Sequence, residues 1–441
     1  MMHALVRRDV AMFDDPLRAQ SISLAVGALL AALVVAAGTV LGLLRGNGVS
    51  DSAPIVMARE TGALYVRVGD TLHPVPNLAS ARLIARSAAA PVPADAASIA
   101  ALKRGPLMGI LGAPAAIGEP LRDPVWTVCD DDRTVVAVGR SDVDHLDPGR
   151  PVLVTPRGEG AATTYLLYDG QRAAVDLRNV AVARALRLDG VVPVPVSRTL
   201  LDVVPEVPAI TPPSITGAGT PGPASLAGAT IGTVVSVGGE RFVVLRDGLQ
   251  RVGEVAADLI RYAYDAGGRP PMTVAPTAVA ALPVADELPV GTFPRRAGTP
   301  VGAADGFAVC ARWRPGGSAP TSSKTAVLVG ESPYRDAAEV TVLARADGAG
   351  PAVDAVVIPG GASVYVRSAR IVGDDGAGGA RFLITDAGVV FGVHDDDTAK
   401  LLGLSEVAEI APWPIVANLP RGPELGVDAA SVIRDGFPTP S

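Results

Sequence analysis

The longest uncharged stretch of the chain lies near its N-terminus. The run from Ile22 to Leu44 contains 23 mostly apolar residues and no charge. At about 1.5 Å per residue, a helix of this run is about 34 Å long, which is enough to cross a bilayer. A cleaved signal peptide is the alternative, but its apolar core usually has only about 7–15 residues. The pattern therefore predicts a cytoplasmic segment at 1–20 and an uncleaved single-pass transmembrane helix at 21–45.

The arginines around this run favour an N-terminus in the cytoplasm, because the side with more Lys and Arg tends to stay there. The bias is narrow: three arginines precede the run and two follow it closely, namely Arg7, Arg8 and Arg18 against Arg45 and Arg59. Within the run, Gly38 and Gly42 lie four residues apart. Small residues at this spacing let a second helix approach closely, so we predict that these glycines form a helix-packing face.

After residue 50 the apolar pattern changes to short β-like runs that recur in a fixed order. Four segments have an aromatic residue in a short strand, a Gly-containing turn, a second apolar strand and then an Ala/Leu-rich helical stretch. Such turns suit hairpins that need a positive φ. The aromatic anchors of the four segments are Tyr65, Tyr165, Phe242 and Phe382.

The first and fourth segments agree further along the chain. Arg104-Gly105-Pro106 and Arg421-Gly422-Pro423 each begin 39 residues after their anchor. An identical motif at an identical offset indicates internal duplication. We therefore predict four hairpin-plus-helix repeats.

The stretches between the repeats contain both cysteines of the chain. Trp126 precedes Cys129 by three residues, and Trp313 follows Cys310 by three residues, each pair within a β-like run. This mirror arrangement is expected where two strands of one core meet. We predict a Cys129–Cys310 disulfide that closes a loop of about 180 residues and contributes about 5 kcal/mol in an oxidising compartment. Two buried free thiols are the alternative.

The predicted fold is a single N-terminal transmembrane α-helix followed by an elongated α+β ectodomain. In that ectodomain, four hairpin-plus-helix repeats surround a discontinuous β-rich central domain. Pro/Gly-rich linkers set off the middle two repeats. The predicted repeats are repeat 1 (55–114), repeat 2 (156–210), repeat 3 (225–290) and repeat 4 (373–430), and the central domain is built from two separate stretches, 115–155 and 295–372.

Composition supports a folded, acidic ectodomain. The 441 residues are 49% hydrophobic, and their 49 Gly and 39 Pro fall short of a low-complexity chain. Residues 1–45 carry four arginines and three aspartates, so the formal net charge of -7 becomes -8 for residues 46–441. This charge argues against nucleic-acid binding and against electrostatic attraction to anionic lipid.

The sequence contains no recognisable catalytic or metal-binding pattern. The nearest approach to a phosphate-binding loop, from Gly316 to Thr325, has the wrong spacing between glycine and lysine. No GxSxG motif occurs, the four histidines are scattered, and the two cysteines form no zinc pattern. Three acidic groups lack the spacing of a calcium loop, and the third is expected to cap a helix: they are Asp130 to Asp132, Asp142 to Asp147 and Asp395 to Asp397. We predict no catalytic residue, cofactor or metal.

The residues before the membrane helix resemble a known family. His3 to Ser21, HALVRRDVAMFDDPLRAQS, is similar to the N-terminal signature of EccB, the bitopic membrane component of the ESX or type VII secretion systems of actinobacteria. The hairpin phrase FLITDAGVVFGV, the PRGPELG ending and the two cysteines are also similar, so the resemblance covers nearly the whole chain. One departure is the start, because family members usually carry a longer cytoplasmic segment upstream.

The resemblance implies a structural subunit of the type VII inner-membrane complex, which exports small helical Esx-type proteins, with its large domain in the periplasm. The implied partners are the motor ATPase EccC, EccD and EccE, with the MycP protease and further EccB copies as additional candidates. Two alternatives stay open. One is an ATPase, the label that some relatives carry, and the other is a cell-wall anchor that contacts peptidoglycan.

Overall fold

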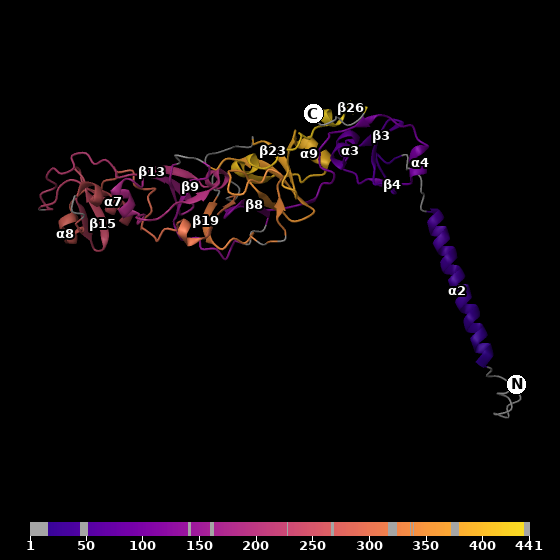
Figure 1. Ribbon diagram of the computed structural model, residues 1–441, viewed down its shortest axis with the longest axis horizontal. Coiled ribbons are helices and arrows are strands. Elements are labelled where there is room, and N and C mark those ends of the chain that lie inside the picture. The colour runs from indigo at the N-terminus through magenta and orange to yellow at the C-terminus, as the bar shows by residue number, and fades with distance from the viewer. Residues whose placement is uncertain are drawn as a thin grey trace, which may run out of the picture. The chain divides into compact units, whose positions relative to one another are not determined.

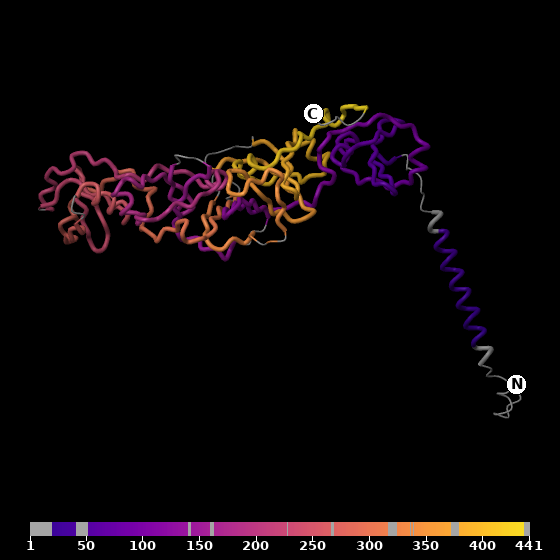
Figure 2. The backbone as a smooth tube through the Cα atoms, in the orientation of Figure 1, coloured from indigo at the N-terminus to yellow at the C-terminus, as the bar shows by residue number. Residues whose placement is uncertain are grey.

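The computed structural model describes residues 16–44, 52–139, 143–158, 163–226, 228–265, 269–315, 324–335, 337, 339–371 and 379–435. The chain divides into two units, residues 1–75 with 89–107 and residues 76–88 with 108–441. Figures 1 and 2 follow the chain from indigo at the N-terminus to yellow at the C-terminus.

The first unit begins with one long helix, α2 (Pro16–Leu44), drawn without interruption in Figure 1. Within it, the 21 residues Gln20–Val40 are apolar and long enough to cross a membrane, and none of this span is buried. A helix of this length that is apolar all round has no counterpart among the amphipathic helices of a soluble surface. The structure therefore has a candidate membrane span where the sequence predicts one.

Four sheets share one strand order. In each, three strands form an antiparallel meander, and a fourth strand, reached through a helix, pairs in parallel with the first. From first to fourth strand, the first sheet contains β1 (Ile55–Ala58), β2 (Leu64–Val68), β3 (Thr71–Val75) and β4 (Val92–Ala94), and the second contains β9 (Val152–Pro156), β10 (Tyr165–Tyr168), β11 (Gln171–Val175) and β12 (Val194–Val196). The third sheet contains β14 (Val234–Val237), β15 (Glu240–Val244), β16 (Leu249–Val252) and β17 (Met272–Thr273). The fourth sheet contains β22 (Ala362–Ala369), β23 (Arg381–Thr385), β24 (Val390–Val393) and β25 (Glu409–Pro412).

Short helices occur at the same two places in all four segments. The first set lies between the third and fourth strands: α3 (Leu78–Ala85), α5 (Val180–Ala185), α7 (Glu254–Tyr264) and α9 (Asp396–Leu402). The second set follows the fourth strand: α4 (Ala96–Ala100), α6 (Arg198–Val203), α8 (Pro276–Val279) and α10 (Trp413–Ala417). The remaining short elements are β5 (Leu107–Met108), β6 (Glu119–Pro120), β13 (Glu206–Ile210), the 3-10 turn η1 (Ala303–Asp305), α11 (Val427–Ala430) and β26 (Ile433–Arg434).

A fifth, six-stranded sheet combines two distant stretches of the sequence. Its order is β19-β18-β7-β8-β21-β20. Figures 1 and 2 show purple and orange stretches of the chain side by side here, with β8 and β19 labelled in Figure 1. The strands are β7 (Val125–Asp130) and β8 (Thr134–Gly139) from the earlier stretch, and β18 (Ala308–Arg314), β19 (Lys324–Gly330), β20 (Thr341–Val342) and β21 (Ala355–Val357) from the later one.

Two boundaries differ from the sequence prediction. Repeat 2 was predicted to start at 156, but β9 already pairs with β10 and thus belongs to the second of the four similar sheets. Repeat 4 was predicted to start at 373, but β22 pairs with β23. In both cases a long loop separates the first strand from the hairpin, so the hairpin pattern in the sequence does not reveal it.

The helices of the second unit pack in pairs. The apolar faces of α5 and α7 share one core, which contains Val182, Leu259 and Ile260. The faces of α3 and α9 share another, which contains Leu83, Leu402 and Leu425. The prediction placed α3 within one continuous repeat at 55–114, whereas here it packs with elements from the C-terminal end of the chain. An isolated helix of about two turns is unstable in water, so burial of this face is what holds it.

Candidate functional site

The disulfide lies at the centre of the six-stranded sheet. β7 and β18 pair antiparallel, with Cys129 opposite Cys310 and Trp126 opposite Trp313. The two cysteines are bonded, and their Cα atoms are 4.1 Å apart. The prediction of a Cys129–Cys310 disulfide is therefore confirmed.

The Cys129–Cys310 pair and the Trp126–Trp313 pair lie on opposite faces of this sheet, because side chains alternate along a strand. The cysteines pack with Leu146, Leu328 and other apolar residues on one face. The tryptophans, both almost fully buried, pack on the other face, which α6 covers, in a core that also contains residues of α10. Trp126 Nε1 also donates a hydrogen bond of 3.1 Å to the carbonyl oxygen of Ile410 in β25. The tryptophan face thus joins the central sheet to elements of the second and fourth of the four similar sheets.

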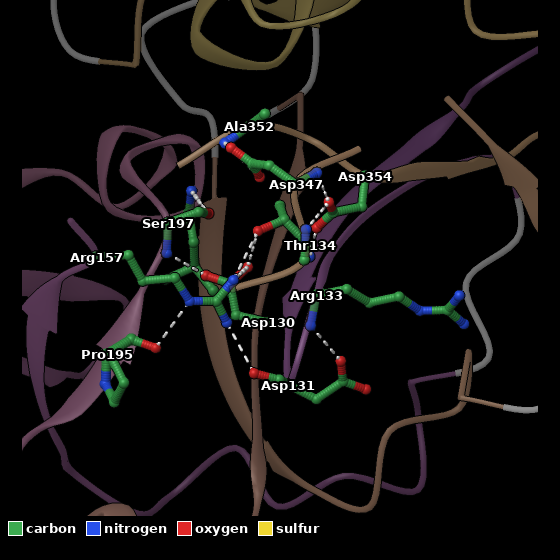
Figure 3. A network of polar contacts seen from close by, with 12 residues as sticks. Asp130, Asp131, Arg133, Thr134, Arg157, Pro195, Ser197, Asp347, Ala352 and Asp354 are labelled. Carbon is green, nitrogen blue, oxygen red and sulfur yellow. Dashed lines mark hydrogen bonds and ion pairs between the residues drawn. The ribbon is translucent and has the colours of Figure 1, made fainter. Parts of the chain in front are cut away.

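Asp130, which directly follows Cys129, begins a buried polar network at the end of β7 (Figure 3). Its side chain is 1% exposed. One carboxylate oxygen accepts a hydrogen bond from Thr134 Oγ1 (2.7 Å), and the other accepts one from the backbone N–H of Ser197 (2.6 Å). Ser197 also caps α6 by accepting from the N–H of Leu200. Asp130 therefore fixes the start of α6 against the β7–β8 turn.

Arg157, which follows β9, is the cation of this network. Its side chain is 4% exposed, and Nη1 lies 4.0 Å from Asp130 Oδ1. Its other donors reach the carbonyl oxygens of Pro195 (3.2 Å) and Asp131 (2.8 Å). Figure 3 shows the guanidinium enclosed by these acceptors. One side chain thus joins the ends of β9 and β12 to the central sheet.

Asp354 extends the network on the other side of Thr134. It accepts from the N–H of Thr134 at 2.6 Å, and its second oxygen accepts at 2.7 Å from the N–H groups of Asp347 and Gly348. Burial raises the pKa of Asp130, outweighing the opposing effects of Arg157, Thr134 and Ser197. The carboxylate oxygens of Asp130 and Asp354 are all used within the protein. The arrangement suits a structural junction between two sheets.

Sequence reasoning missed this junction. In the sequence Asp130 stands out only as a member of an acidic group, and the network draws on residues as distant as 157, 197 and 354. A charged residue at the end of an apolar strand was the one available signal, because a buried charge needs partners.

The four aromatic anchors lie at the same register position in their sheets. Each is directly opposite a valine of the first strand, and that valine is opposite the first residue of the fourth strand. The rows are Tyr65–Val56–Val92, Tyr165–Val154–Val194, Phe242–Val235–Met272 and Phe382–Val366–Glu409.

The two Arg-Gly-Pro motifs lie beside the third strands. Arg104 is bridged to Leu72 and Arg421 to Val390, both in parallel. A Cβ at Gly105 would overlap the ring of His73, and one at Gly422 would overlap the ring of Phe391. Both glycines are therefore needed because an aromatic ring of the third strand lies against the backbone.

The other predicted positions are dispersed. Gly38 and Gly42 lie in α2, and no atom lies within 4 Å of a Cβ added at Gly38. Asp395 caps α9 by accepting from the N–H of Thr398 at 2.7 Å. Residues 316–323 of the glycine-rich stretch, and Asp142, lie outside the described residues. In the portion of the chain that the structure describes, no three His, Cys, Asp or Glu side chains gather as metal ligands do.

A protein-family model matches nearly the entire chain. Residues 1–439 match the family described as type VII secretion system ESX-1, transport TM domain B. A relative from Mycolicibacterium smegmatis named "ESX-3 secretion system ATPase EccB3" is 33% identical over 453 residues, 98% of this chain and 87% of the relative. A Mycobacterium tuberculosis relative named "ESX-2 secretion system ATPase EccB2" is 32% identical over 99% of this chain and 92% of its own length.

Solved structures are similar over most or nearly all of the chain. A chain of an intact ESX-5 inner membrane complex matches with a TM-score of 0.76 and 30% identity, covering 99% of this chain and 93% of that one. A chain of the EccB3 dimer from the ESX-3 core complex matches with a TM-score of 0.73 and 32% identity, covering 86% of this chain and all of that one.

Proposed function

The chain belongs to the EccB family of type VII secretion components, and we propose that it is a structural subunit of an ESX inner-membrane complex that exports small helical Esx-type proteins. The observation that carries this proposal is the similarity to a chain of an intact ESX-5 inner membrane complex over 99% of this chain. In this proposal α2 anchors the chain, residues 1–20 lie in the cytoplasm, and the sheets form a periplasmic scaffold.

The buried junction supports a scaffold. The disulfide joins two strands of the central sheet, and the Trp126–Ile410 and Asp130–Arg157 contacts join that sheet to its neighbours. A rigid framework of this kind serves to hold neighbouring subunits at fixed positions. We also propose that the four similar sheets arose from one duplicated unit, with Tyr65, Tyr165, Phe242 and Phe382 as equivalent residues.

The proposed partners are the other core membrane components, EccC, EccD and EccE, together with MycP and further EccB copies. In α2, Gly38 and Gly42 are the proposed contact with a neighbouring transmembrane helix. The word ATPase in the names of the relatives describes those proteins and not this chain. In this chain, strand β19 begins at Lys324, whereas a phosphate-binding loop leads into a helix.

Affinity purification of the tagged chain from native membranes in mild detergent tests the proposal. We expect the other core components to co-elute at constant ratio, and replacement of both Gly38 and Gly42 by leucine to lower that yield while membrane insertion stays intact. An unrelated single-pass protein with the same tag is the control. Elution of the chain alone would contradict the proposal, and strong pelleting with purified peptidoglycan would instead favour a wall anchor.

A further inference from the structure

The two Pro/Gly-rich linkers of the sequence meet at one turn of the β14–β17 sheet. That turn, residues 245–248, joins β15 to β16. Residues 220–223, from the stretch before β14, and residues 282–283, from the stretch after α8, line a cavity of about 380 Å³ beside it. The apolar part of the lining consists of three prolines, an isoleucine and a leucine: Pro221, Pro223, Pro283, Ile231 and Leu282. The linkers therefore build a cavity as well as connecting sheets.

Backbone hydrogen bonds fix both walls of this cavity. In the first wall, the N–H of Gly222 donates to the carbonyl oxygen of Ala229 at 3.0 Å. In the second, the N–H of Leu249 in β16 donates to the carbonyl oxygen of Pro283 at 2.9 Å, and the N–H of Ala285 donates to that of Leu249 at 2.9 Å. A cavity whose walls are already ordered loses less conformational entropy when a ligand binds.

Arg246 supplies a cation to the cavity. Its side chain lies against the backbone of Gly217, where an added Cβ would be 3.1 Å from Arg246 Nη2. The residue is exposed, and among the described residues neither a hydrogen bond nor an ion pair engages its guanidinium. The corresponding turns of the other three similar sheets contain no Lys or Arg: they are residues 69–70, 169–170 and 386–389. This cation is thus particular to the third sheet and available to an external anion.

Asp247 places an anion directly after this cation in the chain. Arg246 and Asp247 also line a second hollow of about 260 Å³, which contains Glu287 and the hydroxyl groups of Ser214 and Thr216. Because the same two residues line both hollows, the hollows are neighbours. In the part of the chain that the structure describes, neither Asp247 nor Glu287 has an ion-pair partner. The two hollows together therefore offer an apolar wall, one cation and two carboxylates.

We propose that these hollows bind the C-terminus of a peptide chain that ends in a basic residue followed by a bulky apolar one. The terminal carboxylate accepts hydrogen bonds from the Arg246 guanidinium, and the amide N–H of the last residue donates to Asp247. The last side chain fills the larger cavity beside Ile231 and Leu282. The basic side chain pairs with Glu287 in the smaller hollow. Capture of a terminal carboxylate is a recurring mode of peptide recognition.

Charge and size favour this ligand over two others. A simple anion such as inorganic phosphate would be repelled by Asp247 and Glu287, and residues 46–441 are acidic overall. A peptide end with a basic side chain makes partners of the same two carboxylates. A cell-wall stem peptide that ends in alanine would bring only a methyl group to an apolar cavity of about 380 Å³ and leave most of it unfilled.

Fluorescence anisotropy tests the proposal with a dye-labelled peptide of sequence Gly-Ser-Gly-Lys-Leu. The peptide is titrated with the purified full-length chain in nanodiscs, and empty nanodiscs give the background. We expect saturable binding, and a Kd about tenfold higher when the terminal carboxylate is replaced by an amide, because charge-assisted hydrogen bonds are lost. Exchange of the terminal leucine for alanine, or of the lysine for glutamate, should each also raise the Kd by about tenfold.

Variants of the chain locate the binding. Arg246→Gln should raise the Kd of the carboxylate peptide by about tenfold and leave that of the amidated peptide unchanged, because the amidated peptide already lacks this contact. Asp247→Ala should weaken both peptides. Arg251→Gln is the matched control, since Arg251 lies in β16 of the same sheet, pairs with Glu240 at 2.6 Å and does not line either hollow. It should change neither Kd, and equal melting temperatures would show that all variants are folded.

Four results would overturn the proposal: no binding of the Lys-Leu peptide, equal affinity for its amidated form, equal effects of Arg246→Gln and Arg251→Gln, or tighter binding of a purified stem peptide that ends in D-alanine. Peptide binding is independent of the proposed function. An Arg246→Gln chain that loses the peptide but still co-elutes with the other core components supports the peptide site and leaves the proposed function intact. A wild-type chain that binds the peptide but never co-elutes with those components contradicts only the proposed function.

Discussion

At the scale of single residues, the junction around Asp130 depends on one cation. Arg157 is nearly fully buried and is the ion-pair partner described for Asp130. A buried pair adds little over an apolar pair of the same shape, but removal of one partner leaves a charge without compensation. The sequence could not predict this pair, because no local pattern relates residue 130 to residue 157.

Replacement of Arg157 by leucine should therefore lower the free energy of unfolding by about 3–5 kcal/mol. Thermal and denaturant unfolding of the purified full-length chain would measure it. Arg178→Leu is the control, because the Arg178 side chain is 92% exposed in its pair with Asp176 and its loss should have no measurable effect. Similar stabilities of the two variants would show that the Asp130 network is dispensable.

At the scale of elements, the sequence predicts hairpins better than isolated strands. The four aromatic anchors all lie in second strands of the similar sheets, because tight turns with glycine leave a local pattern. β9 and β22 were missed because they pair with the hairpin only across a long loop. The fourth strands are short and lie at sheet edges with proline in or beside them, which blocks further strand pairing: the prolines are Pro93, Pro195, Pro271 and Pro412.

Helix α9 depends on its N-cap, and this dependence should vary with pH. Hydrogen bonds from Thr398, the backbone one first, hold the pKa of Asp395 below its ordinary value of 3.8. A carboxyl group whose pKa is lower in the folded state stabilises that state at pH values above its ordinary pKa. This contribution is lost as the pH falls through the lowered pKa. Asp395→Ala should thus cost about 0.5–1 kcal/mol at pH 7, with the cost shrinking below pH 3.8.

Unfolding of the full-length chain at several pH values would measure this difference. Asp395→Asn keeps the acceptor without a titrating charge, so it should lose little stability at pH 7 and show no such pH dependence. A cost for Asp395→Ala that stays constant down to acidic pH would show that the ionised carboxylate contributes nothing to the cap.

At the scale of the whole molecule, the central sheet is where the N-terminal and C-terminal halves of the ectodomain meet. β7 and β8 precede the second and third similar sheets in sequence, while β18 to β21 follow them. The equal spacing of Trp126–Cys129 and Cys310–Trp313, in opposite order, predicts that these two strands pair. Antiparallel pairing places each cysteine opposite the other and each tryptophan opposite the other. The packing of α3 against α9 and of α5 against α7 could not be predicted. The apolar face of a short helix does not specify which other helix it packs against.

The disulfide reports the topology of the chain, because a stable disulfide requires an oxidising compartment. If residues 1–20 are cytoplasmic and the sheets are periplasmic, the buried Cys129 and Cys310 should resist alkylation when the membranes are denatured without reductant, and both should react when the denatured chain is also reduced. A cysteine introduced as Ala4→Cys should react only with membrane-permeant reagents. Mass analysis of the alkylated chain would read out all three positions. Two reactive thiols at Cys129 and Cys310 without reductant would place the sheets in a reducing compartment and refute the proposed orientation.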